Sequence, residues 1–195
     1  MYKVILFDLD GTLTESGEGI TKSVQYALEK LGKPEDDLKK LEVFVGPPLL
    51  QQFMEYAGLD EETGIKAVEY YRERYSTVGI FENQPYPGVE EMLDTLCQKG
   101  YTLAVASSKP EYFVKKILDH FGLTGYFSEI VGSEMSGKRT GKAEVIEEVL
   151  ARLNMQNHRD EVIMVGDKEH DVFGARKAGI ECVAVAYGYG TEQEL

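Results

Sequence analysis

Two carboxylates stand two positions apart near the start of the chain, and their spacing suits phosphoryl transfer. Asp8 and Asp10 flank Leu9, and Gly11 and Thr12 follow them as a turn. Two carboxylates this close are unfavourable when both are ionised unless a cation lies beside them. Mg²⁺ is a hard ion that prefers oxygen ligands, so it suits this pair. One aspartate could then attack phosphorus, while the other protonates the leaving oxygen and later activates water.

A calcium-binding loop or a solvated turn is the alternative for this segment. A calcium loop would need Asp or Asn at the position of Thr12 and a further carboxylate well downstream. Neither that spacing nor the apolar segment directly before Asp8 fits such a loop. Together with the later motifs, the residues favour the catalytic interpretation.

A second pair of carboxylates, Asp167 and Asp171, follows an apolar segment late in the chain. Four positions apart at the start of a helix, both side chains lie on one face, near a helix end that tolerates anions. A capping Asp followed by a surface Asp would explain this pair equally well. Together with Asp8 and Asp10 at one edge of a sheet, the four carboxylates indicate a metal site.

Two further side chains could contact a phosphate group. Ser107 follows an apolar segment, and its hydroxyl could hold a phosphate oxygen where a helix begins near Pro110, although capping that helix is an equal alternative. Lys142 stands at the start of a predicted helix, where a cation is unfavourable unless it meets an anion. Lys138 and Arg139 compete for this role, and a solvated lysine is the alternative.

These polar residues follow short apolar segments that are typical of buried parallel strands. Between these segments, apolar residues recur at helical spacing. Buried strands that alternate with amphipathic helices predict an α/β fold with a parallel sheet covered on both faces. Such sheets bind ligands at the carboxyl ends of their strands, where the polar clusters stand. We predict strands at residues 3–7, 101–106, 161–165 and 181–186, and a weaker one at 129–131.

Residues from about 14 to 84 break this pattern. They contain helical repeats without a buried-strand segment, and Pro85-Tyr86-Pro87-Gly88 follows them. This stretch indicates a helical insertion after the first strand, where it could act as a lid over the Asp8 loop. We therefore predict a core domain from residues 1–14 and 85–195 and a helical cap domain from residues 15–84.

Composition and charge exclude several classes of protein. The 195 residues are 43% hydrophobic and 28% charged, which is typical of a folded domain with room for one insertion. A net charge of -13 without a basic cluster argues against binding to nucleic acid or a membrane surface. No apolar run could span a membrane and no signal peptide is recognised, so we expect a cytoplasmic protein. We expect both Cys97 and Cys182 to be reduced core residues.

The order of these motifs resembles the haloacid dehalogenase (HAD) superfamily, specifically its phosphoglycolate-phosphatase-like branch with a helical cap. Residues 7–13 (FDLDGTL) resemble the nucleophile motif, Ser107 the phosphate-binding hydroxyl, Lys142 the lysine, and residues 166–171 (GDKEHD) the acidic metal motif. The resemblance covers essentially the whole chain. It implies a Rossmann-like parallel sheet core with an inserted all-helical cap domain.

Roles for the four carboxylates follow from this resemblance. Asp8 would be the nucleophile and Asp10 the general acid and base. Mg²⁺ would be held by the carboxylates of Asp8 and Asp167 and by the backbone carbonyl of Asp10. Asp171 would act on the metal directly or through water.

The resemblance also assigns the remaining contacts. It selects Lys142 as the catalytic lysine over Lys138, because the segment 139–146 is similar to that branch. In the inserted region, Gly46 and Pro47 belong to a Val-Gly-Pro-Pro-Leu sequence that is similar to the loop facing the substrate, although it also suits a helix-starting turn. The residues expected to contact phosphate or substrate are Gly11, Thr12, Ser107, Ser108, Gly46 and Pro47.

The function implied is Mg²⁺-dependent hydrolysis of a small phosphate monoester through an aspartyl phosphate, as in phosphoglycolate phosphatases. A 5′-nucleotidase or a β-phosphoglucomutase-like phosphotransferase is the alternative within the superfamily. A phospholigand-binding module is the alternative that is not an enzyme. We expect a monomer or a homodimer, and the sequence leaves open the substrate and the roles of Glu15, Arg72, Arg74 and His170.

Overall fold

The chain forms two compact units in the computed structural model, which describes residues 1–193. The first unit combines Met1–Glu15 with the chain from Pro85 onward, and the second unit is Ser16–Gln84. No helix within the described residues is long and apolar enough to cross a membrane.

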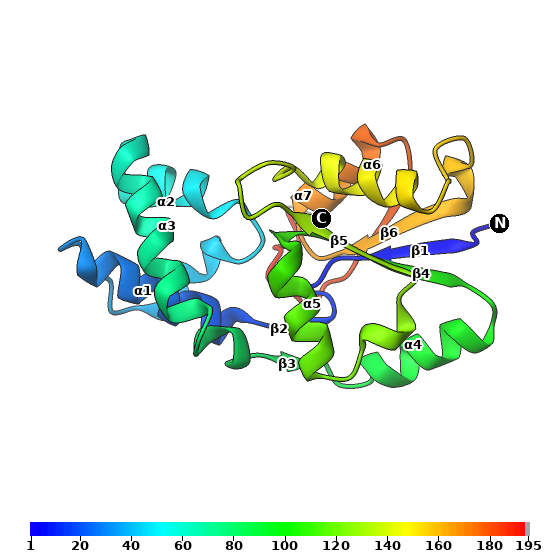
Figure 1. Cartoon of the computed structure of the whole chain (residues 1–195), viewed down its shortest axis with the longest axis horizontal. Coiled ribbons are helices and arrows are strands. Elements are labelled where there is room, and N and C mark those ends of the chain that lie inside the picture. Colours follow the sequence, from blue (N-terminus) through cyan, green and yellow to red (C-terminus); the bar gives the residue numbers. More distant parts are fainter. Residues whose placement is uncertain (194–195) are drawn as a thin grey trace. The chain divides into compact units, whose positions relative to one another are not determined.

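A five-stranded parallel sheet forms the centre of the first unit (Figure 1). Its strand order is β5-β4-β1-β6-β7, so the first strand of the chain lies in the middle. The predicted α/β class is confirmed, and each predicted strand segment overlaps one of these strands. The strands are β1 (Val4–Phe7), β4 (Thr102–Pro110), β5 (Glu129–Ser133), β6 (Val162–Gly166) and β7 (Glu181–Ala184).

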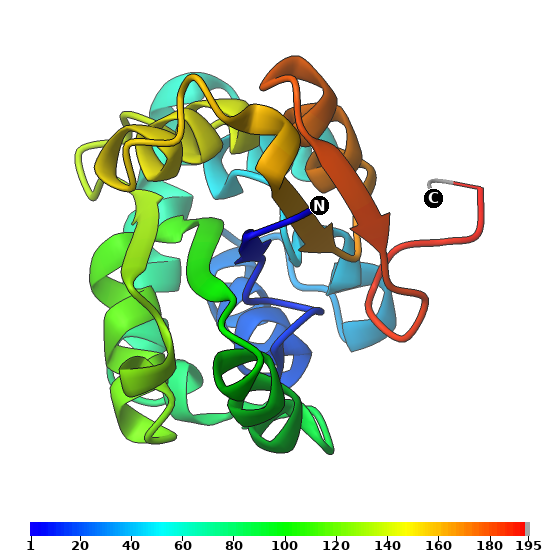
Figure 2. The ribbon, with the colours of Figure 1, turned by 90° about the vertical axis from the view of Figure 1, so that its right-hand side faces the viewer.

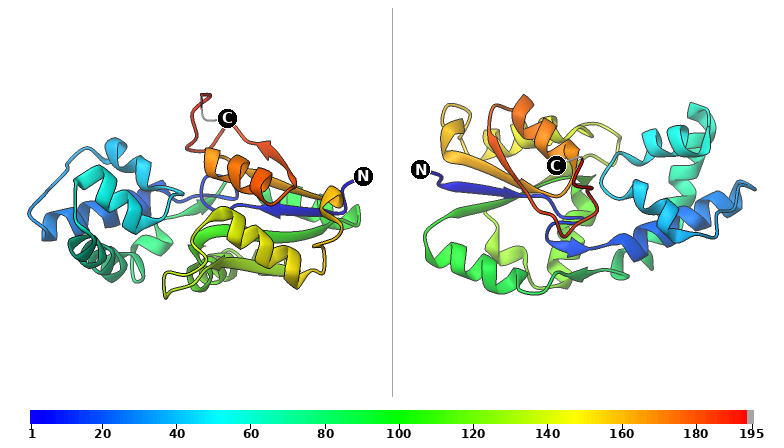
Figure 3. Two further views of the ribbon diagram at one scale, coloured as in Figure 1. Left: turned by 90° about the horizontal axis from the view of Figure 1, so that it is seen from above. Right: turned by 180° about the vertical axis from the view of Figure 1, so that it is seen from behind.

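Helices cover both faces of this sheet (Figures 2 and 3). α6 and α7 lie on one face, where Leu6, Val149 and Met164 belong to a shared apolar core. α4 and α5 lie on the other face. Because both faces are covered, β1 consists entirely of apolar residues. The helices are α4 (Val89–Gln98), α5 (Glu111–His120), α6 (Lys142–Arg152) and α7 (Glu169–Lys177), with the 3₁₀-helices η3 (Thr124–Tyr126) and η4 (Arg159–Glu161).

Strand β4 is longer than predicted because it contains a bulge near its carboxyl end. Ala106 pairs with Val131 of β5, but Pro110 pairs with Ser133, so four steps along β4 match two along β5. The residues between Ala106 and Pro110 are therefore not in regular register with β5. They include Ser107 and its neighbours, which the apolar pattern placed beyond the strand.

The second unit is helical, as predicted for the region between the first strand and the rest of the sheet. Phe44 packs against Phe53 with ring centroids 4.9 Å apart, and Tyr71 stacks on Tyr75. Its elements are α1 (Gly17–Lys30), η1 (Leu38–Phe44), α2 (Leu49–Ala57), α3 (Glu61–Tyr75) and η2 (Gly79–Phe81). A separate two-stranded sheet pairs β2 (Thr14–Glu15) with β3 (Gln84–Pro85).

Both cysteines are free thiols. The expectation that both lie in the core is wrong for Cys97, which is exposed, because α4 buries only Val89 and Leu93. Cys182 is half-buried in β7. Apolar spacing thus identified the helix but not where its buried face ends.

Candidate active site

The strand ends bring the predicted carboxylates of the first unit to one edge of the sheet. Asp8 directly follows β1 and Asp167 directly follows β6, the strand beside it. Carboxylate oxygens of Asp8, Asp167 and Asp171 lie within 4.8 Å of one another, and all three residues are buried. Residues more than 150 positions apart in the sequence therefore form one acidic cluster.

Lys142 links two of these carboxylates from the start of α6. Its Nζ lies 2.8 Å from Asp8 Oδ1 and 2.8 Å from Asp171 Oδ1, and it donates a hydrogen bond to the carbonyl of Ala106 at 3.0 Å. Burial alone lowers the pKa of the Lys142 ammonium, but the facing carboxylates of Asp171 and Asp8 together raise it above its ordinary value. The lysine is therefore a permanent positive charge inside the cluster.

The stem of Lys142 runs close to Gly174 of α7. A Cβ atom at Gly174 would lie 2.6 Å from Lys142 Cγ, so a larger residue there would displace the lysine. The two other cations that compete for its role lie elsewhere. Arg139 pairs with Glu111 and Glu148, and Lys138 is exposed.

Asp171 is buried, so the alternative of a capping Asp167 followed by a surface Asp171 is wrong. Its Oδ2 accepts hydrogen bonds from the backbone N–H groups of Asp167 and Lys168, both at 3.1 Å, and so caps the first turn of α7. Its Oδ1 pairs with Lys142. The helix cap thus holds the carboxylate that faces the lysine.

Asp167 is enclosed by hydrogen-bond donors. The Thr12 hydroxyl donates to its Oδ1 at 3.3 Å, and the backbone N–H of Tyr189 donates to its Oδ2 at 2.7 Å. Two glycines permit this enclosure, since a Cβ at Gly11 or Gly188 would lie 2.1 or 2.3 Å from that same Oδ2. Burial, more than the nearby charge of Asp8, raises the pKa of Asp167 to about 7.

Tyrosines that the sequence pattern did not identify surround the Thr12 turn. The Tyr187 hydroxyl donates to the carbonyl of Thr12 at 2.9 Å, and its ring contacts that of Tyr86 edge to face. Burial, with a smaller contribution from the charge of Asp167, raises the pKa of Tyr86 to about 12. The sequence signal for Tyr187 was its position just after the last predicted strand, and Tyr86 stood in the Pro-Tyr-Pro-Gly segment that follows the helical insertion.

Asp10 lies outside the cluster of three carboxylates and forms an ion pair with a different lysine, Lys109. Its Oδ2 is 3.0 Å from Nζ of Lys109, and each of the two side chains is only 7% exposed. Lys109 was not among the site residues predicted from the sequence. Its signal was its position just after the second predicted strand, beside Ser107.

Ser107 is buried at the bulge of β4, and its hydroxyl accepts a hydrogen bond from the backbone N–H of Lys109 at 3.3 Å. The alternative that Ser107 caps the following helix is wrong, because α5 has Pro110 as its N-cap residue. Ser108 is half-buried in the same bulge. Gly46 and Pro47 lie in the second unit, between η1 and α2, and their contact with substrate stays a prediction.

The charges at this edge of the sheet fit a divalent cation. Four buried carboxylates face two lysines whose side chains are nearly buried, which leaves an excess of two negative charges. Uncompensated buried charge is strongly unfavourable, and an all-oxygen donor set favours a hard cation. The groups counted are Asp8, Asp10, Asp167 and Asp171 against Lys109 and Lys142.

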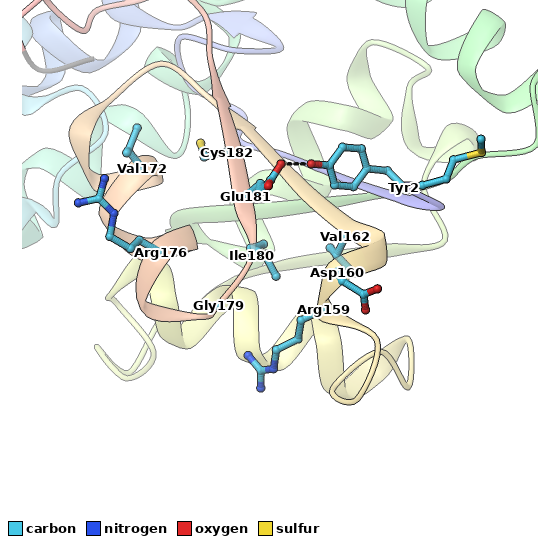
Figure 4. A pocket seen from close by; sticks show the side chains of 11 residues that line it. Tyr2, Arg159, Asp160, Val162, Val172, Arg176, Gly179, Ile180, Glu181 and Cys182 are labelled. Carbon is cyan, nitrogen blue, oxygen red and sulfur yellow. Dashed lines mark hydrogen bonds between the residues drawn. The ribbon is translucent and has the colours of Figure 1, made fainter.

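A separate cavity of about 830 Å³ lies near the amino ends of β6 and β7 (Figure 4). Tyr2, Arg159, Arg176 and Glu181 are among the residues that line it, and the Tyr2 hydroxyl donates a hydrogen bond to the Glu181 carboxylate. Because the acidic cluster stands at the opposite ends of these strands, this cavity is not part of it.

Residues 5–185 match the sequence profile of the haloacid dehalogenase-like hydrolase family. The chain belongs to this family. A predicted phosphatase of the same fold from Clostridium acetobutylicum superposes with a TM-score of 0.97 and 49% identity, and the match covers 100% of this chain and 89% of that one. The expected HAD superfamily and the expected enzyme class, a HAD-type phosphatase, are confirmed.

Named HAD relatives differ in their reactions. The chain is 47% identical over 194 residues to a 5′-nucleotidase from Pseudomonas aeruginosa, covering 100% of this chain and 87% of the relative. It is 39% identical over 188 residues to tyrosine-protein kinase PtkA from Mycobacterium tuberculosis, covering 96% of this chain but 63% of the kinase. It is 31% identical over 194 residues to a phosphoglycolate phosphatase from Pseudomonas savastanoi, covering 96% and 70%.

Proposed function

We propose that this phosphatase hydrolyses a small phosphate monoester through an aspartyl phosphate on Asp8, with Mg²⁺ as its metal ion. The observation that carries the proposal is the buried cluster of Asp8, Asp167 and Asp171, in which Lys142 bridges Asp8 and Asp171. A carboxylate beside a fixed ammonium can meet an anionic phosphate, because the ammonium offsets part of their repulsion.

The donors around this cluster would hold the metal ion. Asp8 and Asp167 would provide carboxylate oxygens and Asp10 its backbone carbonyl, with Asp171 acting directly or through water. When bound, the ion supplies positive charge to the nucleophile and the phosphate oxygens.

Side chains of the protein would carry out the nucleophilic attack, the proton transfers and the stabilisation of charge. An oxygen of Asp8 forms a bond to phosphorus as the bond to the leaving alcohol breaks, and Asp10 gives that alcohol its proton. Asp10 then takes a proton from the water that attacks the aspartyl phosphate, which releases phosphate and restores Asp8. Lys142 stabilises the charge of the phosphoryl group throughout. Gly11, Thr12, Ser107 and Ser108 contact its oxygens.

We further propose that residues 15–84 act as a cap domain that selects the substrate. This segment follows the Asp8 loop directly, so its movement would be coupled to the nucleophile. Gly46 and Pro47 are proposed to face the leaving group of the substrate.

The proposed substrate class is the 5′-nucleoside monophosphates. The name of the 47% identical 5′-nucleotidase supports this class over phosphoglycolate, whose named phosphatase is 31% identical. Phosphoglycolate is the second candidate for that reason. Transfer to an acceptor other than water, as the name of the kinase relative suggests, is the alternative reaction.

The test is a panel of phosphate esters assayed for release of both phosphate and alcohol, with Mg²⁺ or with a chelator. We expect 5′-nucleotides to have kcat/KM values at least about tenfold above phosphoglycolate and sugar phosphates, and all turnover to need Mg²⁺. Alcohol release without phosphate release would instead indicate a phosphotransferase. A folded, Mg²⁺-bound protein that releases neither product from any ester would contradict the proposed hydrolysis.

The stability of the protein should respond to Mg²⁺ more strongly at high pH. The pKa of Asp167 is about 7 in the folded metal-free protein, above its unfolded value. Protonation therefore stabilises the fold fully at low pH, and up to about 4 kcal/mol of this contribution is lost as pH rises from about 4 to about 7. A bound cation removes the cost of ionising Asp167, so the rise in Tm with Mg²⁺ should be larger at about pH 8 than at about pH 5.5.

Thermal unfolding with and without Mg²⁺ at both pH values checks this expectation. Asp167→Asn is the matched control, because it has nearly the same shape and does not titrate. The difference in unfolding free energy between the unchanged chain and this variant isolates the contribution of Asp167 from that of other groups. An equal Mg²⁺ effect at both pH values would contradict the role of Asp167.

A further inference from the structure

The ion pair of Lys109 and Asp10 is separate from the carboxylates that Lys142 contacts. Lys109 Nζ lies 3.0 Å from Asp10 Oδ2, and both side chains are almost fully removed from solvent. A buried ion pair adds little stability over apolar side chains of similar size, because both charges lose their hydration. Fold stability therefore gives little reason for a lysine at this position.

The local backbone holds Lys109 at the edge of the sheet where the chemistry is proposed. It lies in the bulge of β4, after regular pairing with β5 ends at Ala106. Gly132 of β5 faces this bulge, and a Cβ atom there would lie 2.4 Å from the carbonyl oxygen of Lys109. The backbone N–H of Lys109 donates to the Ser107 hydroxyl at 3.3 Å. The position of the lysine is thus fixed by the bulge, a close approach and a hydrogen bond.

The two carboxylate oxygens of Asp10 have different surroundings. Oδ2 faces the ammonium of Lys109, whereas Oδ1 is buried and accepts no hydrogen bond from the part of the chain that the structure describes. A buried acceptor without a partner is unfavourable, so it is expected where another molecule provides the partner. The ester oxygen of a substrate and the attacking water are such partners.

We propose that Lys109 is a positioning residue for proton transfer: it anchors Asp10 through Oδ2 and so presents Oδ1 to the substrate. The proton leaves Oδ1 for the ester oxygen as the bond from phosphorus to the alcohol breaks. Oδ1 later accepts a proton from the water that releases phosphate from Asp8. This inference rests on the proposed function, because it takes Asp10 as the acid and base of that reaction.

Substrates with different leaving groups can distinguish a lysine that positions Asp10 from a lysine that binds the phosphate group. A nucleoside 5′-alkoxide is strongly basic and needs a proton as it departs, whereas p-nitrophenolate departs without one. The ratio kcat/KM reports the steps up to the phospho-enzyme, so loss of the anchor should reduce kcat/KM for an alkyl ester and spare p-nitrophenyl phosphate. A lysine that bound the phosphate group itself would reduce both values alike, because both esters carry the same group.

The experiment compares Lys109→Ala, Asp10→Asn and the double variant with the unchanged chain in saturating Mg²⁺. The substrates are p-nitrophenyl phosphate and the alkyl ester with the highest kcat/KM in the panel. We expect Lys109→Ala to lower kcat/KM by about 10²-fold for the alkyl ester and by less than about threefold for the aryl ester. In the Asp10→Asn background the same substitution should change either value by less than about threefold, since the residue that it positions is already inactive.

Two further variants make the result decisive. Lys109→Met keeps the apolar stem, so it should stay folded and show the same pattern if Lys109→Ala does not fold. Lys138→Ala removes an exposed lysine and should leave kcat/KM unchanged for both esters. This variant controls for the change in net charge.

Equal losses on the two esters, or a full additional loss in the Asp10→Asn background, would overturn the positioning role. Failure of the proposed function would look different. In that case the loss of kcat/KM caused by Asp10→Asn would be the same for both esters, or the unchanged protein would hydrolyse neither ester with Mg²⁺.

Discussion

Replacement of Asp8 by asparagine should abolish turnover, lowering kcat by at least about 10⁴-fold. An amide has nearly the shape of the carboxylate but is too weak a nucleophile to form an acyl phosphate with the phosphorus of the substrate. Asp8 is buried with its Oδ1 2.8 Å from Lys142, so the variant removes a reacting atom without removing packing. Initial rates of phosphate release with Mg²⁺ measure the loss, and intact mass after rapid quenching with acid should show one phosphoryl group on the unchanged chain alone.

The control for this variant is Asp160→Asn, which makes the same chemical change at an exposed residue. It should keep full activity. Asp8→Asn should remain folded, because Lys142 keeps Asp171 as a partner and the acidic cluster loses one of its excess charges. Activity of Asp8→Asn within about tenfold of the unchanged chain would rule out Asp8 as the nucleophile.

Replacement of Lys142 by methionine should reduce both stability and activity. Methionine keeps much of the stem that passes Gly174, but Asp8 and Asp171 would then face each other without a cation. Breaking a buried ion pair costs about 3–5 kcal/mol of unfolding free energy. Loss of a fixed charge beside the phosphoryl group should lower kcat by about 10²–10³-fold. Urea unfolding and steady-state kinetics measure the two effects.

A double variant separates these two effects. Lys142→Met combined with Asp171→Asn removes one of the carboxylates left unpaired, so more than half of the lost stability should return while activity stays low. Lys138→Ala, at an exposed lysine, should change stability by less than about 0.5 kcal/mol. If the double variant were instead less stable than Lys142→Met, the charge balance that we assign to this cluster would be wrong.

The acidic cluster could be predicted from the sequence because strands and helices, whose residue patterns are periodic, position its carboxylates. A carboxylate that directly follows a buried strand stands at the carboxyl edge of the sheet whatever the details of packing. Asp8 and Asp167 follow that rule, and Asp171 reaches the same place by helical spacing. Lys142 was a candidate because of its unfavourable position at a helix start, and the family resemblance selected it over Lys138. Its two carboxylate partners compensate for that position.

The contacts that were missed depend on irregular backbone. Lys109 reaches Asp10 from a bulge, and Tyr189 reaches Asp167 through a backbone N–H in a turn. Neither a bulge nor a turn has a period that side-chain patterns reveal. The cap role suggested for Ser107 was wrong for the same reason, since the irregular end of β4 continues past Ser107 to Pro110, the N-cap residue of α5.

Residue types and spacing alone therefore determined the α/β class, the edge of the sheet where the proposed chemistry takes place, and the carboxylates at that edge, while the family resemblance selected the lysine. Only the tertiary structure decided which cation faces which carboxylate: Lys142 contacts Asp8 and Asp171, while Lys109 contacts Asp10. The physical reason is that charge pairing in a buried site depends on separations of a few ångströms. Those separations are set by close approaches such as Gly174 to Lys142 and Gly132 to Lys109, between segments distant in the sequence.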